Sequence, residues 1–332
     1  MAISYSQSVD LRGNAADPVI LELLFQNSTI KDSLVDFVDG IKANTIFTEN
    51  KNTVTAQAWT TNPSPSGTIT VADTLITPVK VEFHDVFDYD VLRSGRWGRS
   101  MQPGAWNIIS DEFNKVVLNG IANNVSASIE SDFWNGATAA TQTAVAALTA
   151  GTGQTSVGAA EKTYVAAAPT RQFDGVVTRL IYNNAGVGKR YKVAGTTITV
   201  SNIATEYAKL YTAINPVLFG QASEQPFIYA PRSHRQLINL FNVNQTYRDT
   251  FVVQTDGRVF YLGTEIKFVP IAENQLIAAL PSMIKWCTDA MEDLNMVQVD
   301  QMPKPRKDFY YDVVFMIFAH VVNQNFATLY VG

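Results

Sequence analysis

The chain has 332 residues, of which 46% are hydrophobic and 17% are charged, and its formal net charge is −5. This hydrophobic content is typical of a globular protein and excludes a wholly disordered chain. The low, negative charge leaves no basic stripe, which excludes specific recognition of DNA or RNA. Because Cys287 is the single cysteine, an intrachain disulfide is excluded as well.

No segment has the pattern that targets a protein to a membrane. The N-terminal residues lack a basic region followed by an apolar core, which argues against a secretory signal. The best candidate for a membrane span, 313–322, is shorter than the roughly 18–20 residues that a span needs, and it contains His320. We therefore expect a protein that folds in a cytosol and does not enter a membrane.

The first predicted element is an N-terminal arm over residues 1–44. Asp17-Pro18 opens a short helix, and an amphipathic second helix is predicted over 28–43. These elements come before any strong strand, so we expect the arm to be extended. The apolar face of the second helix consists of Ile30, Leu34, Phe37, Val38 and Ile41.

A long β-hairpin is predicted over residues 45–92. Its return strand, 68–91, follows a turn that holds Pro63, Pro65 and Gly67. Few large apolar residues lie near this tip, so the hairpin is marginal alone and needs a surface to lie on. At about 3.3 Å per residue, arms of about 20 residues reach roughly 60 Å, which exceeds the radius of a compact unit of this size.

Three arginines, Arg93, Arg96 and Arg99, lie in a glycine-broken loop after the hairpin. A phosphate-binding patch is one interpretation of this cluster. The acidic remainder of the chain favours another, in which the arginines reach carboxylates on a neighbouring chain.

One long helix is predicted over residues 104–136. The segment has no proline, apolar residues recur at helical spacing, and Asn135-Gly136 is a suitable C-terminal stop. About 30 residues at about 1.5 Å each span roughly 45 Å, several times the usual helix length. Because a helical turn has about 3.6 residues, an apolar row spaced by four residues shifts gradually around the helix. We therefore expect the helix to pass from one packing environment to another. An ordinary long core helix is the alternative. The expected packing positions are Phe113, Val117, Ile121, Val125, Ile129 and Phe133.

The remainder of the chain divides by composition into three parts. Residues 137–170 are rich in Ala, Thr and Gly and are predicted to form a surface loop or flap outside the core. Residues 171–280 mix helix and strand patterns, including a strand at 196–202, and predict a compact α+β unit. Residues 281–332 are mostly strand-like, with a long apolar strand inside 309–322.

No catalytic or metal-binding constellation emerges from the sequence. The histidines, His84, His234 and His320, are scattered, without partners at metal-ligand spacing, and His234 is predicted to lie on a capped surface helix. Acidic residues at 88 and 90 could hold a cation, but a solvated strand end is the better interpretation. Cys287 lies in an apolar strand, which is typical of a buried, inert thiol. We therefore predict no catalytic site, no cofactor and no metal.

The order of these elements resembles the major capsid proteins of tailed bacteriophages, the family with the HK97-like fold. An arm, a long hairpin with a Pro-Gly tip, a single long helix, an alanine-rich loop, an α+β unit and a β-rich end follow one another over nearly the whole chain. The segments 261–270 and 275–295 resemble the family's late region. The resemblance implies an α+β fold that comprises an N-terminal arm (1–44), an extended hairpin or E-loop (45–92), a peripheral domain with the spine helix (93–170), an axial domain (171–280) and return strands of the peripheral domain (281–332).

The resemblance also implies a function. It implies a structural protein that assembles as pentamers and hexamers into an icosahedral shell around viral double-stranded DNA, bound without sequence specificity. Its partners would be further copies of itself, a portal protein and a separate scaffolding protein, with decoration proteins as an open option. The chain would be made in a bacterial cytoplasm and reside in the virion. The hairpin tip (Pro63, Pro65, Gly67) and the three arginines are the expected intersubunit contacts.

Two departures and two alternatives accompany this interpretation. The arm begins within about 20 residues of Met1, so either a separate scaffolding protein is used or the arm suffices. The lysine and asparagine of the family's crosslinking variant have no match, so we expect no covalent crosslinks. Another phage structural protein, such as a tail-tube or adhesin subunit, is the first alternative. An α/β enzyme is the second, and it would need a regular strand–helix alternation that the sequence lacks.

Overall fold

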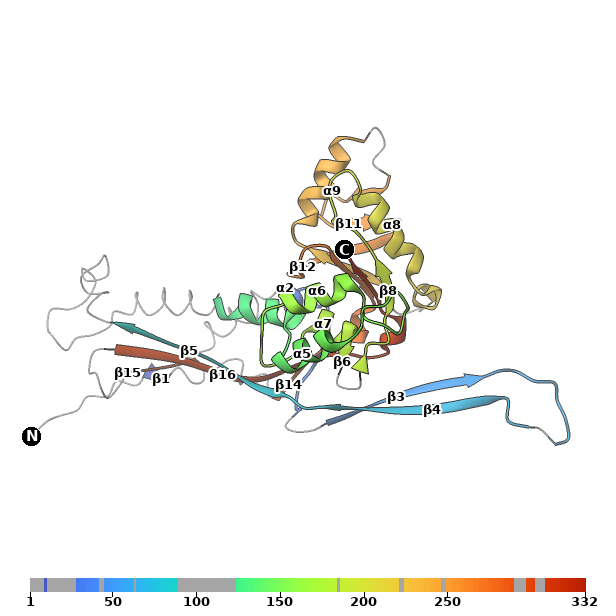
Figure 1. Cartoon of the computed structure of the whole chain (residues 1–332), viewed down its shortest axis with the longest axis horizontal. Coiled ribbons are helices and arrows are strands. Elements are labelled where there is room, and N and C mark those ends of the chain that lie inside the picture. Colours follow the sequence, from blue (N-terminus) through green and yellow to red (C-terminus); the bar gives the residue numbers. More distant parts are fainter. Residues whose placement is uncertain are drawn as a thin grey trace, which may run out of the picture.

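The computed structural model describes residues 9–10, 28–41, 45–62, 64–88, 124–183, 186–220, 224–245, 249–289, 297–301 and 308–332. Within these ranges the chain has an α+β architecture (Figure 1). A six-stranded and a seven-stranded sheet form its two main layers, and two separate two-stranded sheets accompany them.

The six-stranded sheet is built around β16 (Asp308–Val321), the longest strand described. Its sequence is rich in aromatic and β-branched residues, which favour extended backbone. One edge of β16 pairs with β5, and the other edge pairs first with β15 and then with β14. The surrounding strands are β5 (Val79–Asp88), β14 (Ile284–Thr288), β15 (Val297–Gln301), β2 (Asp36–Val38) beside β14, and β1 (Val9–Asp10) beside β15.

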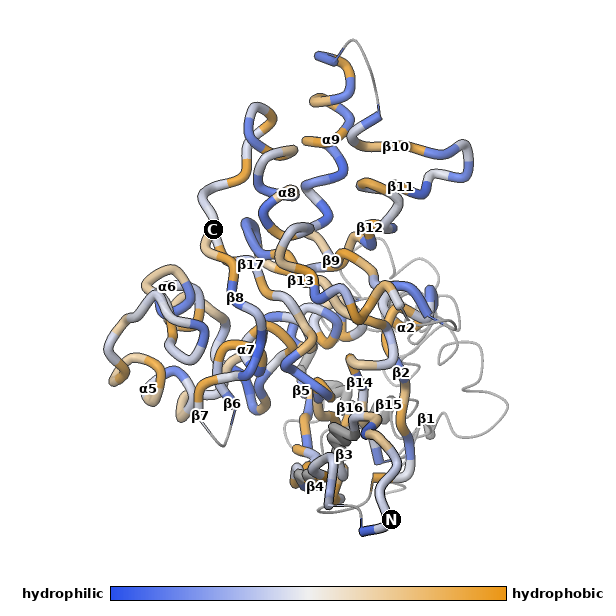
Figure 2. The backbone as a smooth tube through the Cα atoms, turned by 90° about the vertical axis from the view of Figure 1, so that its right-hand side faces the viewer, coloured by the Kyte–Doolittle hydropathy of each residue, from blue (hydrophilic) through white to orange (hydrophobic). Residues whose placement is uncertain are grey.

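The seven-stranded sheet has the order β10-β11-β12-β9-β13-β17-β8 and carries helices along it (Figure 2). Its strands are β8 (Tyr191–Ala194), β9 (Phe227–Pro231), β10 (Phe251–Val253), β11 (Val259–Tyr261), β12 (Thr264–Val269), β13 (Gln275–Ala279) and β17 (Thr328–Val331). The helices beside this sheet are α8 (Ile203–Ala213) and α9 (His234–Val243), whereas α7 (Val176–Ile181) packs against β16 of the six-stranded sheet. The 3₁₀ turns are η3 (Pro216–Gly220), η4 (Pro281–Met283) and η6 (Gln324–Phe326). The small β6 (Tyr182–Asn183) pairs with β7 (Gly186–Val187).

The hairpin is shorter than its predicted range of 45–92. It consists of β3 (Thr45–Val54) and β4 (Gly67–Ile76), which pair over ten residues. The chain then breaks at Pro78, which has no N–H to donate to a ladder. β5 begins at Val79 and joins β16, so the predicted return strand is two strands in two different sheets.

The predicted helix over 28–43 is wrong beyond its first turn. The helix α2 covers only Ser28–Lys31, and Ser33 has a left-handed φ of 49° that ends it. The following residues form β2, parallel to β14, because aromatic and β-branched side chains fit a pleated surface. Leu34 and Ile41 are buried nonetheless. The predicted helix after Pro18 lies outside the described residues.

Residues 137–170 were wrongly predicted to be a loop outside the core. They form two helices, α5 (Ala139–Ala147) and α6 (Ala159–Ala167). Alanine has the highest helix propensity, and Thr138 caps α5 by accepting a hydrogen bond from the Thr141 N–H. Four side chains of this segment lie in the main core: Val145, Val157, Tyr164 and Val165. A segment of low sequence complexity therefore packs into the core.

Two strand assignments within residues 171–332 also need correction. Residues 196–202 do not form the predicted strand, and β8 precedes them. The last strand, β17, was assigned with the peripheral return strands, but it lies between β13 and β8 in the seven-stranded sheet. The predicted helices at 204–214 and 232–243 and the turn at Gly257 agree with α8, α9 and the β10–β11 hairpin.

The main hydrophobic core runs continuously from one large sheet to the other, and one face of the helical segment 124–135 lies within it. Val125, Ile129 and Phe133 are 3%, 6% and 0% exposed, respectively. The Phe133 ring stacks on Trp286 with 4.3 Å between ring centroids. The other expected packing positions, Phe113, Val117 and Ile121, lie outside the described residues.

Truncating Phe133 to alanine should lower the free energy of unfolding by about 3–5 kcal/mol, because the change removes a fully buried ring and leaves a cavity against Trp286. Asn124→Ala, at an exposed position of the same helical segment, is the matched control and should change stability by less than about 0.5 kcal/mol. Urea unfolding followed by circular dichroism measures both. A Phe133→Ala variant as stable as the Asn124→Ala variant would contradict the packing described here.

Candidate assembly surface

The β3–β4 hairpin extends away from the two sheets (Figure 1). Its root is held by the body, since Ile76 is fully buried in a small second core with Ile41, Cys287 and Phe318. Along the two strands, large apolar side chains face solvent. Ile46, Ile69, Val71 and Leu75 are each more than half exposed, at 59%, 68%, 57% and 53%.

The tip of the hairpin is ordered by its own hydrogen bonds. The backbone N–H and hydroxyl of Thr55 both donate to the Ser66 carbonyl, and the Gln57 amide donates to the Ser64 carbonyl. Trp59 lies between these contacts and is 89% exposed. An indole held this far from any core is unusual, because Trp is among the most strongly buried residues on average.

The expected contact residues are only partly visible. Pro65 is exposed and Gly67 is the first residue of β4, whereas Pro63 lies outside the described residues. Arg93, Arg96 and Arg99 lie outside them too, so their role remains a prediction.

Sequence reasoning selected the tip and missed the apolar side chains along the strands. Ile69, Val71 and Leu75 alternate with polar or small residues in β4, which is the period-two signal of a strand with one apolar face. That signal was available from the sequence. What the sequence did not show was that none of the described residues covers this face.

A second exposed apolar area lies at the end of the seven-stranded sheet that carries α9 and β10 (Figure 2). Leu240 and Val243 of α9 are 53% and 73% exposed, and Val252 and Val253 of β10 are both 45% exposed. β10 is the terminal strand of its sheet, so its outer backbone edge is unpaired within the sheet order.

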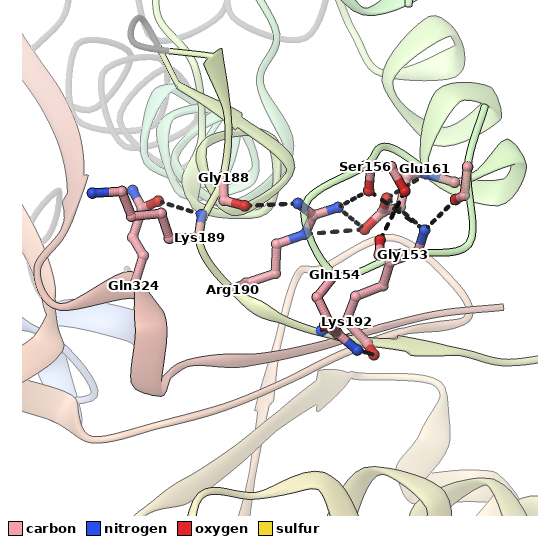
Figure 3. A network of polar contacts seen from close by, with 11 residues as sticks. Gly153, Gln154, Ser156, Glu161, Gly188, Lys189, Arg190, Lys192 and Gln324 are labelled. Atoms are coloured by element: carbon pink, nitrogen blue, oxygen red, sulfur yellow. Dashed lines mark hydrogen bonds and ion pairs between the residues drawn. The ribbon is translucent and has the colours of Figure 1, made fainter. Parts of the chain in front are cut away.

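A buried ion-pair network joins the loop between α5 and α6 to β8 (Figure 3). The Arg190 guanidinium, with no exposed surface, donates to the Glu161 carboxylate at 2.5 Å and to the Gly188 and Ser156 carbonyls. The same carboxylate accepts the Gly158 N–H at 2.7 Å. Lys192 donates to the Gly151 carbonyl, and both its backbone N–H and its carbonyl bond the side-chain amide of Gln154.

Removing the Glu161 carboxylate should therefore destabilise the protein strongly. Glu161→Ala leaves the Arg190 charge buried without its counter-ion, and we expect a loss of about 3–5 kcal/mol in the free energy of unfolding. As a control, Asp256→Asn removes one partner of the exposed Arg258–Asp256 pair and should leave the melting temperature unchanged. Equal melting temperatures for the two variants would show that the buried network does not hold the loop.

The histidines do not form a common site. His84 is exposed, whereas His234 and His320 are buried, so the prediction that His234 lies on the protein surface is wrong. His234 accepts or donates one hydrogen bond, from Nδ1 to the Tyr207 hydroxyl at 3.1 Å. In the described part of the chain, the Nε2 atoms of both buried rings have no hydrogen-bond partner. Burial lowers the pKa of His234 to about 4. Burial, together with the positive charges of Arg179 and Lys285, lowers the pKa of His320 to about 4.

These two pKa values predict a pH dependence of stability. Both rings stay neutral in the folded protein, whereas histidines of the unfolded chain take up protons near pH 6.5. Between about pH 6.5 and pH 4 the unfolded state binds more protons, so stability falls as the pH is lowered through this window. His320→Gln should make this fall shallower, and the exposed His84→Gln should not. Unfolding curves between pH 7 and pH 4 test this, and identical slopes for all three proteins would refute it.

The described residues were also searched for a metal site, a reactive thiol and a membrane-spanning helix. They contain no group of three or more His, Cys, Asp or Glu side chains that could hold a metal ion. Cys287 is buried, and burial raises the pKa of its thiol to about 12, which makes it a poor nucleophile at neutral pH. None of the helices in these ranges combines the length and the apolar character that crossing a membrane requires.

Comparison with known proteins gives matches in structure but not in sequence. No family model and no curated protein matches the chain. A chain of the satellite phage P4 procapsid that includes the size determination (Sid) protein matches with a TM-score of 0.53 at 12% identity, covering 98% of this chain and 93% of that one. A chain from the capsid of Myoviridae phage XM1 matches with a TM-score of 0.53 at 10% identity, covering 92% and 91%. A chain from the capsid of a native GTA particle matches with a TM-score of 0.51 at 11% identity, covering 100% and 95%.

Identities of 10–12% establish a common fold and no more. The matches nevertheless cover 92–100% of this chain and 91–95% of the matched chains. The chain therefore has the HK97-like fold of the major capsid proteins of tailed phages.

Proposed function

We propose that this chain is the major capsid subunit of a tailed phage or a GTA-like particle, a structural protein and not an enzyme. The observation that carries the proposal is the β3–β4 hairpin, which projects from the body with large apolar side chains in solvent (Figure 1). Fully burying one such side chain is worth about 1.5–3 kcal/mol, so a free subunit leaves a large favourable term unused. A neighbouring copy that covers the hairpin would supply it.

The second exposed apolar area supports the same proposal. α9 and β10 lie at the far end of the seven-stranded sheet, at the opposite side of the body from the hairpin root (Figure 1). Two different exposed apolar surfaces on one subunit favour head-to-tail contacts, in which one surface of a copy contacts the other surface of the next. Such contacts close into rings when the rotation between copies permits. We propose that such rings are the pentamers and hexamers of an icosahedral shell.

The contents and partners of the shell are part of the proposal. The net charge of −5 limits adhesion to DNA, which suits a container for double-stranded DNA that it does not read. A portal protein, a separate scaffolding protein and decoration proteins are the further partners. The proposed contacts with neighbouring copies are the hairpin tip, the three arginines Arg93, Arg96 and Arg99, and residues 104–123, for which the sequence predicts a helix. The shell would assemble in a bacterial cytoplasm and remain in the virion.

The hairpin gives the direct experiment. Replacing residues 49–72 by Asn-Gly keeps the root pairs from Thr45–Ile76 to Thr48–Asp73 and joins them by a two-residue turn that suits a hairpin. We expect a folded subunit, because the root and the core remain, but no closed shells, because the projecting part is gone. Circular dichroism, light scattering and negative-stain microscopy of the parent and the variant measure both effects.

Two outcomes would count against the proposal. Parent protein that stays monomeric at every concentration, with and without a scaffolding partner, would remove the capsid function. Normal, robust shells from the shortened protein would show that the hairpin is not an intersubunit element.

A further inference from the structure

A cavity of about 610 Å³ lies where the chain crosses between the two large sheets. One crossing leads from β13 of the seven-stranded sheet through η4 to β14 of the six-stranded sheet, and the other returns from β16 through η6 to β17. The turn η3, which follows α8, contributes a third wall. This volume is within the range of roughly 300–1,000 Å³ that is usual for binding pockets.

The cavity is apolar inside and polar at its rim. Leu218, Leu280 and Met283 are at most 8% exposed, and Phe326 is partly buried. Ser282 at the rim is exposed, so the cavity opens to solvent. A large apolar side chain that replaced the water inside would therefore be stabilised by the hydrophobic effect.

The rim also carries a carboxylate that is held in place. Of the described residues that line the cavity, Glu224 alone is charged. Its Oε1 accepts the Ser282 N–H at 3.1 Å, and its Oε2 accepts the Ser282 hydroxyl at 2.5 Å, so each oxygen keeps room for a further donor. In the described part of the chain, no Lys, Arg or His forms an ion pair with Glu224.

An occupant that matches this cavity needs an apolar side chain with a cation close to it. Residues 93–99, Arg-Ser-Gly-Arg-Trp-Gly-Arg, supply both. Trp97 and Arg99 are two positions apart, so in an extended segment their side chains point to the same side, with no side chain on Gly98 between them. Trp and Arg are also among the residues that most often dominate the binding energy of an interface.

The segment cannot reach the cavity of its own chain. β5 and β16 run side by side, and Asp88, the last described residue before the segment, is opposite Asp308 (Figure 1). The cavity lies just beyond the other end of β16, after Val321, roughly 43 Å away at about 3.3 Å per residue. Trp97 is nine residues beyond Asp88, and nine residues span at most about 32 Å. An occupant from this segment must therefore belong to another copy.

We propose that the cavity binds residues 97–99 of a second copy of the chain, with the Trp97 ring inside and the Arg99 guanidinium on the Glu224 carboxylate. This inference rests on the proposed function and goes beyond it by naming the surface that one of the predicted arginine contacts uses. Because both crossings line the cavity, the docked side chain would contact the two segments that join the sheets. A contact between copies would then act at the junction of the two sheets.

Exchanging the two charges tests the ion pair. Glu224→Arg and Arg99→Glu should each raise the subunit concentration needed for assembly roughly tenfold or more, because each brings two like charges together. The double variant restores an opposite pair and should assemble at close to the parental concentration. Light scattering measures assembly, and circular dichroism measures the melting temperature of each free subunit. Single variants that assemble like the parent, or a double variant as defective as the single ones, would overturn the proposed pair.

A disulfide between copies tests the position and leaves the proposed contact residues unchanged. Gly98→Cys together with Val217→Cys, which is on the rim and 54% exposed in the parent, should give covalently linked copies when assembled particles are mildly oxidised. Gly98→Cys together with Thr143→Cys, at an exposed position of α5, is the matched control and should give none. Cys287 is buried and should not take part.

A non-reducing gel shows the linked copies as chains of doubled mass. No linked copies from the first pair, or equal yields from both pairs, would overturn the proposal, even if the charge variants fail to fold.

The parent protein separates the two levels of failure. Parent subunits that never assemble would end both the proposed function and this inference. Parent subunits that form shells, together with a Gly98→Cys and Val217→Cys pair that forms shells and stays unlinked in them, would leave the capsid function in place and remove only the cavity as a docking site.

Discussion

The structure depends on an aromatic joint at the end of the helical segment 124–135, where two consecutive residues face two different sheets. Phe133 stacks on Trp286 of β14 in the six-stranded sheet, and Trp134 packs against Tyr229 of β9 in the seven-stranded sheet, 5.3 Å between ring centroids. Both side chains on the helix are fully buried. Because the two contacts come from neighbouring positions on a rigid helix, the sheets cannot move independently without breaking one of them.

Hydrogen bonds reinforce the same joint. Glu130, one turn earlier, accepts from the backbone and hydroxyl of Thr29 and forms an ion pair with Arg232 at 2.8 Å. Asn135 donates to the Pro270 carbonyl and accepts from the Ala272 N–H. A single helix end thus joins the segment around Thr29 to both sheets.

The β3–β4 hairpin, the helices α8 and α9 and the turn between β10 and β11 could be predicted from the sequence, since periodicity and turn residues are local signals. The errors arose where composition or pairing is ambiguous. Alanine-rich segments such as 159–167 have the same low complexity in a flexible loop and in a packed helix, and only tertiary contacts separate the two. The sheet that β17 joins is a matter of distant pairing, which no local pattern specifies. The break at Pro78 was visible in the sequence but was read as part of one strand.

For the candidate assembly surface, the sequence predicted a hairpin and not its faces. Register decides which residues share a face, and a shift by one residue would exchange them all. Pro65 and Gly67 were predicted as contact residues because proline and glycine mark a turn clearly in the sequence. The exposed apolar area, however, lies along the strands, at Ile69 and Val71. Burial at the root by Phe47 and Ile76 comes from residues far away in the chain, and it could not be inferred from the hairpin sequence alone.

The Gln154 side chain has a consequence for the open edge of the seven-stranded sheet. β8 is the last strand at that side, and an unpaired strand edge is a template for another chain. The side-chain amide of Gln154 accepts a hydrogen bond from the Lys192 N–H and donates one to the Lys192 carbonyl, as the backbone of a neighbouring strand would. One side chain therefore blocks edge-to-edge growth of the sheet. A strand of another copy therefore finds no free backbone groups at Lys192 with which to extend the sheet.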